Sequence, residues 1–134
     1  HSLGGALATL CALDLVDNGL PVWNVVTFGS PRVGNGAFRD YYDEHLHGQT
    51  LRVVAQGDPV TVMPPWFNGY RHLGREVYLQ NNGDVKVEPG LIGKAIPVAQ
   101  SIYHDLRETE ATKSLVFFGP HSLRNYAKLI AALA

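Results

Sequence analysis

The opening residues of the chain, His1-Ser2-Leu3-Gly4-Gly5, constrain its fold more than any other segment. A serine on a tight turn between a strand and a helix needs small neighbours, because its backbone is strained and the flanking elements approach closely. Gly4 provides that space, and a helix beginning here directs free N–H groups and its positive dipole end at the serine. The segment therefore predicts that Ser2 is a nucleophile and that the Leu3 N–H is an oxyanion donor. The alternative is that Ser2 only caps the helix.

The remaining pattern alternates between helical and extended segments. Residues 22–28 are β-branched and aromatic with few charges, which predicts a strand buried on both faces. Asn81-Asn82-Gly83 lies between two extended runs, 76–80 and 84–87, and predicts a hairpin. The chain is therefore expected to be α/β, with a mostly parallel sheet and a late antiparallel hairpin. The other expected elements are helices at 3–16, 36–46, 91–110 and 123–133, and strands at 51–55 and 115–118.

Composition excludes several classes of function. The net charge of the 134 residues is -1, and no basic stripe is present to neutralise phosphates, so no nucleic-acid partner is expected. No apolar run reaches the roughly 18 residues of a transmembrane segment. No set of histidines and carboxylates has zinc-ligand spacing, so neither a metal nor an organic cofactor is expected. The single cysteine, Cys11, lies among apolar residues and is expected to be buried.

Four segments, taken together, resemble the class 3 lipases, the fungal-type triacylglycerol lipase family. They are HSLGGALA (1–8), TFGSPRVGN (27–35), the stretch 52–65 with its RVV (52–54), DPV (58–60) and PP (64–65), and GYRHLGREVY (69–78). The likeness is strong over residues 1–80 and loose over residues 115–134. The resemblance implies an α/β-hydrolase fold and a serine ester hydrolase that acts on lipid esters. It also implies that the segment around His72 and the paired prolines Pro64 and Pro65 are structural.

Asp58 is the expected triad acid. In this fold the nucleophile is followed by an acid and then by a histidine, and the acid lies where a sheet strand ends. Asp58 follows the expected strand 51–55, precedes Pro59, and matches the Asp-Pro-Val position of the family. The alternative is a turn-forming aspartate before proline. Other aspartates are expected on the first helix (Asp14, Asp17), on a solvated helical face (Asp40, Asp43) and near the hairpin tip (Asp84).

His121 is the expected base. The base must follow Asp58 and lie on a loop, and His121 comes after the breaker Gly119-Pro120. The family has a late His-Ser followed by a tyrosine, which is Tyr126 here, although Pro120 replaces the aspartate that often precedes this histidine. His104 is expected at the surface, and the resemblance predicts that His72 bonds across the hairpin. His45 and His47 precede Asp58 and are expected to be solvated.

These residues predict an ester hydrolase with an acyl-enzyme intermediate and a lipid or other ester as its partner. Residues 1–134 are expected to be the C-terminal part of the domain, with the N-terminal half absent. The second oxyanion donor, and a lid that touches a lipid interface transiently, are expected upstream, so residues 1–134 alone are expected to be inactive and poorly soluble. The alternatives are a phospholipase A1, feruloyl-type esterase or monoacylglycerol lipase with the same triad, or a non-catalytic lipid-binding or interaction fragment. The apolar segment 64–67 is expected either to line an acyl pocket or to pack as core.

Overall fold

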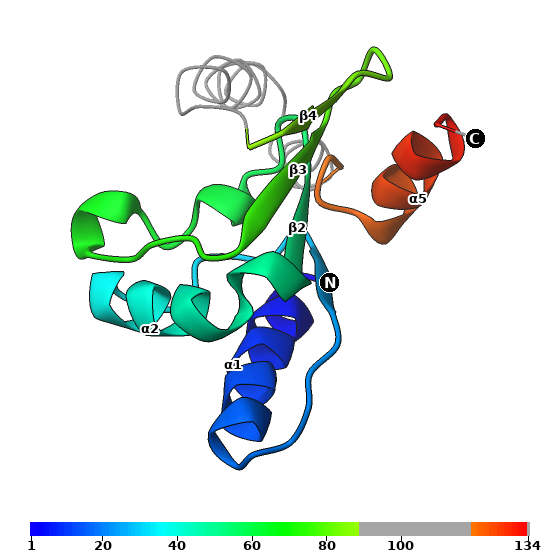
Figure 1. Cartoon of the computed structure of the whole chain (residues 1–134). Helices are drawn as coiled ribbons and strands as arrows, with labels where there is room; N and C mark the ends of the chain where they lie inside the picture. Colours follow the sequence, from blue (N-terminus) through cyan, green and yellow to red (C-terminus); the bar gives the residue numbers. More distant parts are fainter. Residues whose placement is uncertain (89–118, 134) are drawn as a thin grey trace.

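The computed structural model describes residues 1–88 and 119–133, and these form one sheet covered by helices (Figure 1). Strands β1, β2 and β3 are parallel neighbours, and β4 pairs antiparallel with β3 at the end of the sheet. The expected α/β class and late hairpin are therefore confirmed. The elements expected at 91–110 and 115–118, with His104, lie outside the described residues. The bounds are α1 (Leu3–Asp17), β1 (Val25–Phe28), α2 (Gly36–Leu46), η1 (His47–Gln49), β2 (Thr50–Ala55), η2 (Val60–Val62), η3 (Trp66–Asn68), β3 (Arg75–Leu79), β4 (Val85–Val87) and α5 (Leu123–Ala131).

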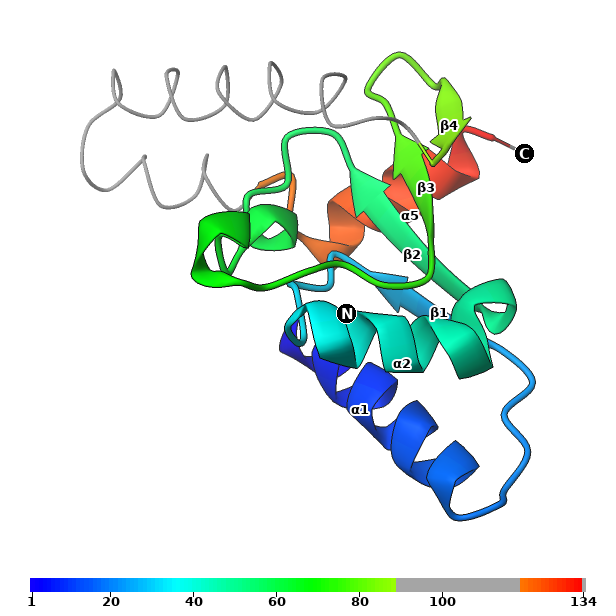
Figure 2. The same ribbon diagram turned by 60° about the vertical axis from the view of Figure 1, so that its left-hand side comes forward.

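Helices cover the two faces of the sheet unequally. Helices α1 and α2 lie together against one face, whereas α5 lies on the other (Figure 2). The first face has a core around Leu13, Tyr42 and Leu46, and the second has a smaller core around Leu79 and Tyr126. Because successive strand residues point to opposite faces, Val53 and Ala55 of β2 pack in the second core, whereas the Thr50 hydroxyl bonds to Tyr42 of α2 on the first face.

The face under α1 and α2 includes a buried ion pair. Arg52 Nη2 lies 2.9 Å from Glu76 Oε2, and Arg52 Nε donates to the carbonyl of Leu73 at 2.8 Å. Burial lowers the pKa of Arg52, and the Glu76 carboxylate opposes this shift. Removal of either partner would leave an uncompensated buried charge, so this pair fixes β2 against β3 and the segment before it.

Helix α1 buries mainly its small residues. Cys11 is exposed, so its expected burial is wrong, and Leu7 and Leu10 are 57% and 45% exposed. The reason is a close approach: a Cβ on Gly5 would lie 2.9 Å from the Cβ of Ser30. Small residues fit against β1 at this distance, and Leu7 and Leu10 lie outside the contact. The buried residues of α1 are Gly5, Ala6, Thr9, Ala12 and Leu13.

Strand β1 is an edge strand and is not buried on both faces as expected. It starts at Val25 rather than at residue 22, and Val26 is 50% exposed. The physical reason is that α5 packs against β2 and meets β1 at its last residue, Phe28, which lies edge-on to Tyr126, whereas Val26 stays half-exposed. No helix in the described ranges 1–88 and 119–133 is long and apolar enough to cross a membrane.

Candidate active site

Ser2 lies on a strained turn at the start of α1. Its backbone has φ 56° and ψ -133°, and its N–H donates to the carbonyl of Phe28, at the end of β1, at 3.0 Å. A positive φ at a residue with a side chain carries a strain cost, and such strain is concentrated at functional sites. The Ser2 side chain makes no capping hydrogen bond, which contradicts the alternative that it only caps the helix. Leu3 is the first residue of α1, so its N–H has no partner within the helix.

His121 lies between Ser2 and Asp58. Its Nε2 is 2.9 Å from Ser2 Oγ, and its Nδ1 is 3.1 and 3.0 Å from the two carboxylate oxygens of Asp58. Because a carboxylate only accepts hydrogen bonds, Nδ1 carries the hydrogen, and in the neutral ring Nε2 is then free to accept from the serine hydroxyl. The three residues expected from the sequence therefore form one continuous hydrogen-bonded chain at the carboxyl ends of β1 and β2.

Asp58 is buried and has further donors around its carboxylate. The N–H of Val60 donates to Oδ1 at 2.9 Å, and the hydroxyl of Tyr126 donates to Oδ2 at 2.6 Å. The Tyr126 oxygen in turn accepts from the N–H of Ala55, the last residue of β2, at 3.0 Å. Buried carboxylates require such donors, since an uncompensated charge in the interior costs several kcal/mol.

Tyr126 is a part of the site that sequence reasoning did not include. Burial, and then the Asp58 carboxylate, raise the pKa of Tyr126 above its ordinary value, so the phenol stays protonated and remains a donor. Its signal in the sequence was the family pattern of a tyrosine after the late His-Ser. A contact to Asp58 did not follow from that pattern, because the two residues are far apart in the chain.

Gly29 lies beneath the hydrogen-bonded chain and is a second residue that the sequence did not identify. A Cβ at this position would lie 2.9 Å from Asp58 Oδ2, 3.1 Å from His121 Nδ1 and 3.1 Å from the Tyr126 hydroxyl. Its φ of 58° also lies in the region that favours glycine. The three polar groups can therefore meet only because residue 29 has no side chain.

His72, His45 and His47 lie outside this chain of contacts. His72 Nε2 donates to the carbonyl of Thr61, in the turn after Asp58, at 2.7 Å, and the predicted bond of His72 across the hairpin stays a prediction. His45 and His47 are exposed, as expected. No group of three or more histidine, cysteine or acidic residues suited to a metal ion occurs among residues 1–88 and 119–133.

The loop after Asp58 is held by Arg32 and presents aromatic side chains to solvent. Arg32 donates through Nη1 to the carbonyl oxygens of Val62 and Pro64. Trp66 and Phe67 are 64% and 71% exposed, which contradicts their expected alternative role in core packing. The acyl-pocket alternative for this segment stays a prediction.

The architecture and the serine turn define an α/β-hydrolase, and comparison with known proteins specifies the family. The family model "Lipase (class 3)" matches residues 1–68, and the chain belongs to this family. It is similar to the secreted mono- and diacylglycerol lipase 1 of Fusarium solani, with 44% identity over 79 residues. It is also similar to phospholipase A1-II 5 of Oryza sativa subsp. japonica, with 37% identity over 90 residues. These matches cover 59% and 60% of this chain but only 23% and 19% of the relatives, so the chain spans about a fifth to a quarter of their length.

Solved structures support the same fold. Lipase II from Rhizopus niveus is 32% identical with a TM-score of 0.61, over 67% of this chain and 36% of that one. A triacylglycerol lipase whose catalytic centre is described as a serine protease triad is 41% identical with a TM-score of 0.56, over 65% of this chain and 34% of that one. The expected fold class, an α/β-hydrolase fold with a mostly parallel sheet, is confirmed.

Proposed function

We propose that this chain carries the catalytic residues of a serine carboxylic-ester hydrolase that acts on lipid esters. The observation that carries the proposal is the single hydrogen-bonded chain from Ser2 Oγ through His121 to Asp58, with distances of 2.9 and 3.0 Å. Membership of the class 3 lipases supports lipid esters as the substrate class. In this proposal Ser2 is the nucleophile, His121 the base and Asp58 the acid.

The reaction has two half-reactions with the same residues. His121 Nε2 takes the hydroxyl proton as Ser2 Oγ attacks the ester carbonyl carbon, and the protonated imidazole then gives that proton to the leaving alcohol oxygen as the C–O bond breaks. Water attacks the acyl-enzyme with His121 again as base, and release of the acid returns the proton to Ser2. Asp58 orients the imidazole and stabilises its charged form.

The oxyanion of each tetrahedral intermediate needs donors that are already in place. The proposal assigns one to the N–H of Leu3, which belongs to the unpaired first turn of α1. The dipole of α1 favours negative charge at the same point. A second donor is expected from a segment outside residues 1–134, because hydrolases of this fold use a donor from a loop before the nucleophile.

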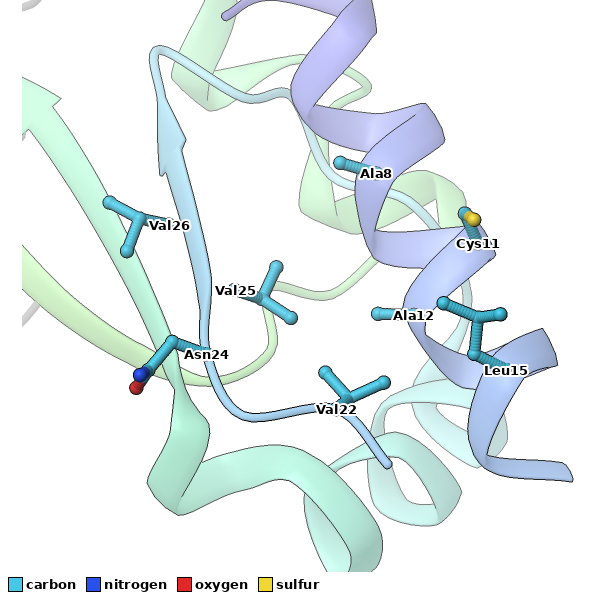
Figure 3. A pocket seen from close by; sticks show the side chains of 8 residues that line it. All are labelled: Ala8, Cys11, Ala12, Leu15, Val22, Asn24, Val25 and Val26. Carbon is cyan, nitrogen blue, oxygen red and sulfur yellow. The ribbon is translucent and has the colours of Figure 1, made fainter. Parts of the chain in front are cut away.

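We further propose that residues 1–134 are the C-terminal part of a larger hydrolase domain. The supporting feature is a hollow of about 350 Å³ between α1 and the open edge of β1 (Figure 3). Its walls are mostly apolar, and within residues 1–88 and 119–133 β1 pairs with only one strand, β2. A strand and its cover at this edge would satisfy the unpaired backbone groups and bury the hollow. The lining residues are Ala8, Cys11, Ala12, Leu15, Val22, Asn24, Val25 and Val26.

The proposed chemistry is tested in the complete protein that contains residues 1–134. Ser2→Ala should reduce hydrolysis of nitrophenyl esters to a residual level, since a triad without its nucleophile loses about six orders of magnitude in kcat. A fluorophosphonate probe should label Ser2, located by peptide mass mapping. Ser30→Ala is the matched control, because this serine packs close to Gly5 of α1 and its hydroxyl donates to the carbonyl of Pro31 at 3.2 Å, and it should keep both activity and labelling. Wild-type turnover in Ser2→Ala would reject the proposal.

The substrate class is tested with the same protein. The alternatives to a triacylglycerol or diacylglycerol lipase are a phospholipase A1 and a feruloyl-type esterase, which cleave the same kind of bond. Rates on diacylglycerol, phosphatidylcholine and methyl ferulate, compared as kcat/KM, separate the three. A complete protein that binds lipid vesicles but has no turnover on any of them would instead support the non-catalytic fragment.

A further inference from the structure

His1 makes two contacts with the proposed base, and neither is needed to explain the triad. Its Nε2 is 2.6 Å from the backbone carbonyl oxygen of His121, and the centroids of the two imidazole rings are 4.5 Å apart with planes tilted by 34°. The His1 ring also meets Tyr126 edge-on at 5.7 Å. His1 is half-buried, so these contacts form one wall of the site.

The hydrogen bond has a defined direction. A backbone carbonyl only accepts, so Nε2 of His1 carries the hydrogen and donates it to His121. This bond acts on the main chain of the base, whereas Asp58 acts on the ring. Two anchors at different ends of the same residue restrict both its backbone and its χ angles, and one anchor alone restricts only part of them.

The segment that carries His121 needs such an anchor. It belongs to no strand, and it forms a turn in which Ser122 N–H donates to the Gly119 carbonyl at 3.1 Å. Catalysis depends on placement of the base to within about 0.5 Å, and sites on loops are less precise than sites on helices or strands. His1 directly precedes Ser2, so its bond joins the nucleophile turn to the base turn without an intervening element.

We propose that His1 is a positioning residue for ester hydrolysis: it holds His121 against Ser2 through the backbone bond and the ring contact. This inference rests on the proposed function. The loss of His1 contacts should lower the rate of proton transfer and leave substrate binding unchanged. Kcat, expressed per Ser2 site titrated with the fluorophosphonate, should therefore fall while KM stays the same. A general loss of structure would instead lower the number of sites that can be titrated.

Three substitutions in the complete protein separate the two contacts. His1→Phe keeps a ring but removes the donor, His1→Gln keeps a donor at a similar reach but removes the ring, and His1→Ala removes both. A neutral hydrogen bond and an aromatic pair each correspond to a factor of about three to ten. We expect each single loss to lower kcat by about that factor and His1→Ala to lower it by about their product. The rate of fluorophosphonate labelling at Ser2 should fall in parallel.

His45 provides a matched control. It also places a ring nitrogen 2.8 Å from a backbone carbonyl oxygen, that of Tyr41, and its ring centroid lies 4.6 Å from that of Tyr41 with planes tilted by 49°, but it is exposed on α2. His45→Phe and His45→Ala should leave kcat and KM at the wild-type values. Equal losses in the His1 and His45 series would overturn the inference, because the effect would then be general.

The remaining outcomes are equally decisive. Wild-type kcat in folded His1→Ala, or a raised KM with unchanged kcat, would overturn the positioning role. If His1→Phe or His1→Ala does not fold, His1→Gln alone decides, since it keeps the donor and its kcat should fall with KM unchanged. A failure of the proposed function itself is distinguishable, because the wild-type protein would then show neither turnover nor labelling at Ser2.

Discussion

The carboxyl edge of the sheet and the open edge at β1 are built in opposite ways. At the carboxyl edge, Asp58 accepts hydrogen bonds from His121, Tyr126 and the backbone of Val60, and it is buried. At the open edge, Val26 is half-exposed beside an apolar hollow. The residues described here therefore complete a polar constellation for themselves but leave an apolar surface without cover.

The difference shows which interactions are local to this part of the chain. Polar groups at the carboxyl edge come from segments that meet at the ends of two adjacent parallel strands, β1 and β2, so the sheet itself brings them together. Apolar cover for β1 requires another strand or helix, because an edge strand has unpaired N–H and C=O groups and one uncovered face. A site can therefore be well ordered beside an edge that is incomplete.

Asp58→Asn should produce the largest effect after Ser2→Ala, and this effect should be confined to the carboxyl edge. An amide leaves the imidazole in the wrong tautomer, and kcat should fall by about 10⁴-fold, as for the equivalent change in a serine protease triad. The measurement is steady-state ester hydrolysis by the complete protein. Asp14→Asn, at an exposed position on α1, is the control and should keep wild-type kcat. Wild-type kcat in Asp58→Asn would contradict the role of Asp58 as the triad acid.

Gly29→Ala should produce the next largest effect. Its Cβ would meet the three polar groups of the site within 3.1 Å, so Asp58 and His121 must move apart, and we expect at least about a hundredfold loss of kcat. Gly19→Ala is the matched control: its φ is 74° and nothing lies within 4 Å of the added Cβ. Both variants should lose about 1 kcal/mol in unfolding free energy through the backbone alone. Equal kcat in the two would show that the space at Gly29 is not required.

Tyr126→Phe should change the response of stability to alkali. The pKa of Tyr126 is raised in the folded protein from its ordinary 10.0, so the unfolded state releases this proton first as pH rises. The stabilisation of the folded state that comes from this raised pKa is therefore fully present below pH 10. It is lost above pH 10, by up to about 1.4 kcal/mol per pH unit. The free energy of unfolding, measured with urea between pH 8 and pH 11, should fall less steeply with pH for Tyr126→Phe than for the wild type. Tyr70→Phe should behave as the wild type, and identical slopes in all three would contradict the assignment.

Val26→Lys should have the smallest effect on stability and act only at the open edge. Residues 1–134 produced alone are expected to self-associate through β1, and a lysine on an edge strand opposes such pairing. Gel filtration should show a shift toward the monomer, with unfolding free energy changed by no more than about 0.5 kcal/mol. Leu20→Lys, which also changes an exposed apolar residue but lies outside the edge strand, is the control. A monodisperse, active wild-type fragment would show that this edge needs no cover.

The sequence alone determined the parts of the fold that depend on short-range chemistry. Small residues after Ser2 predicted the turn and helix α1, and Asn82-Gly83 predicted the hairpin of β3 and β4. The same reasoning selected Asp58, since an acid after a strand and before a proline lies at a strand end. The order serine, acid, histidine then left few candidates for the base. These signals act over a few residues or follow chain order, so no tertiary contact is needed to interpret them.

Only the tertiary structure decided which side chains meet. Gly29 and Tyr126 contact Asp58 through a packing arrangement that no local pattern encodes, and His1 reaches His121 across nearly the whole chain. The same packing left Cys11 exposed, although its neighbours in the sequence are apolar. Burial depends on what lies opposite a residue. The sequence lists the groups available for contact, but the distance between α1 and β1, and the reach of α5, determine which of them are covered.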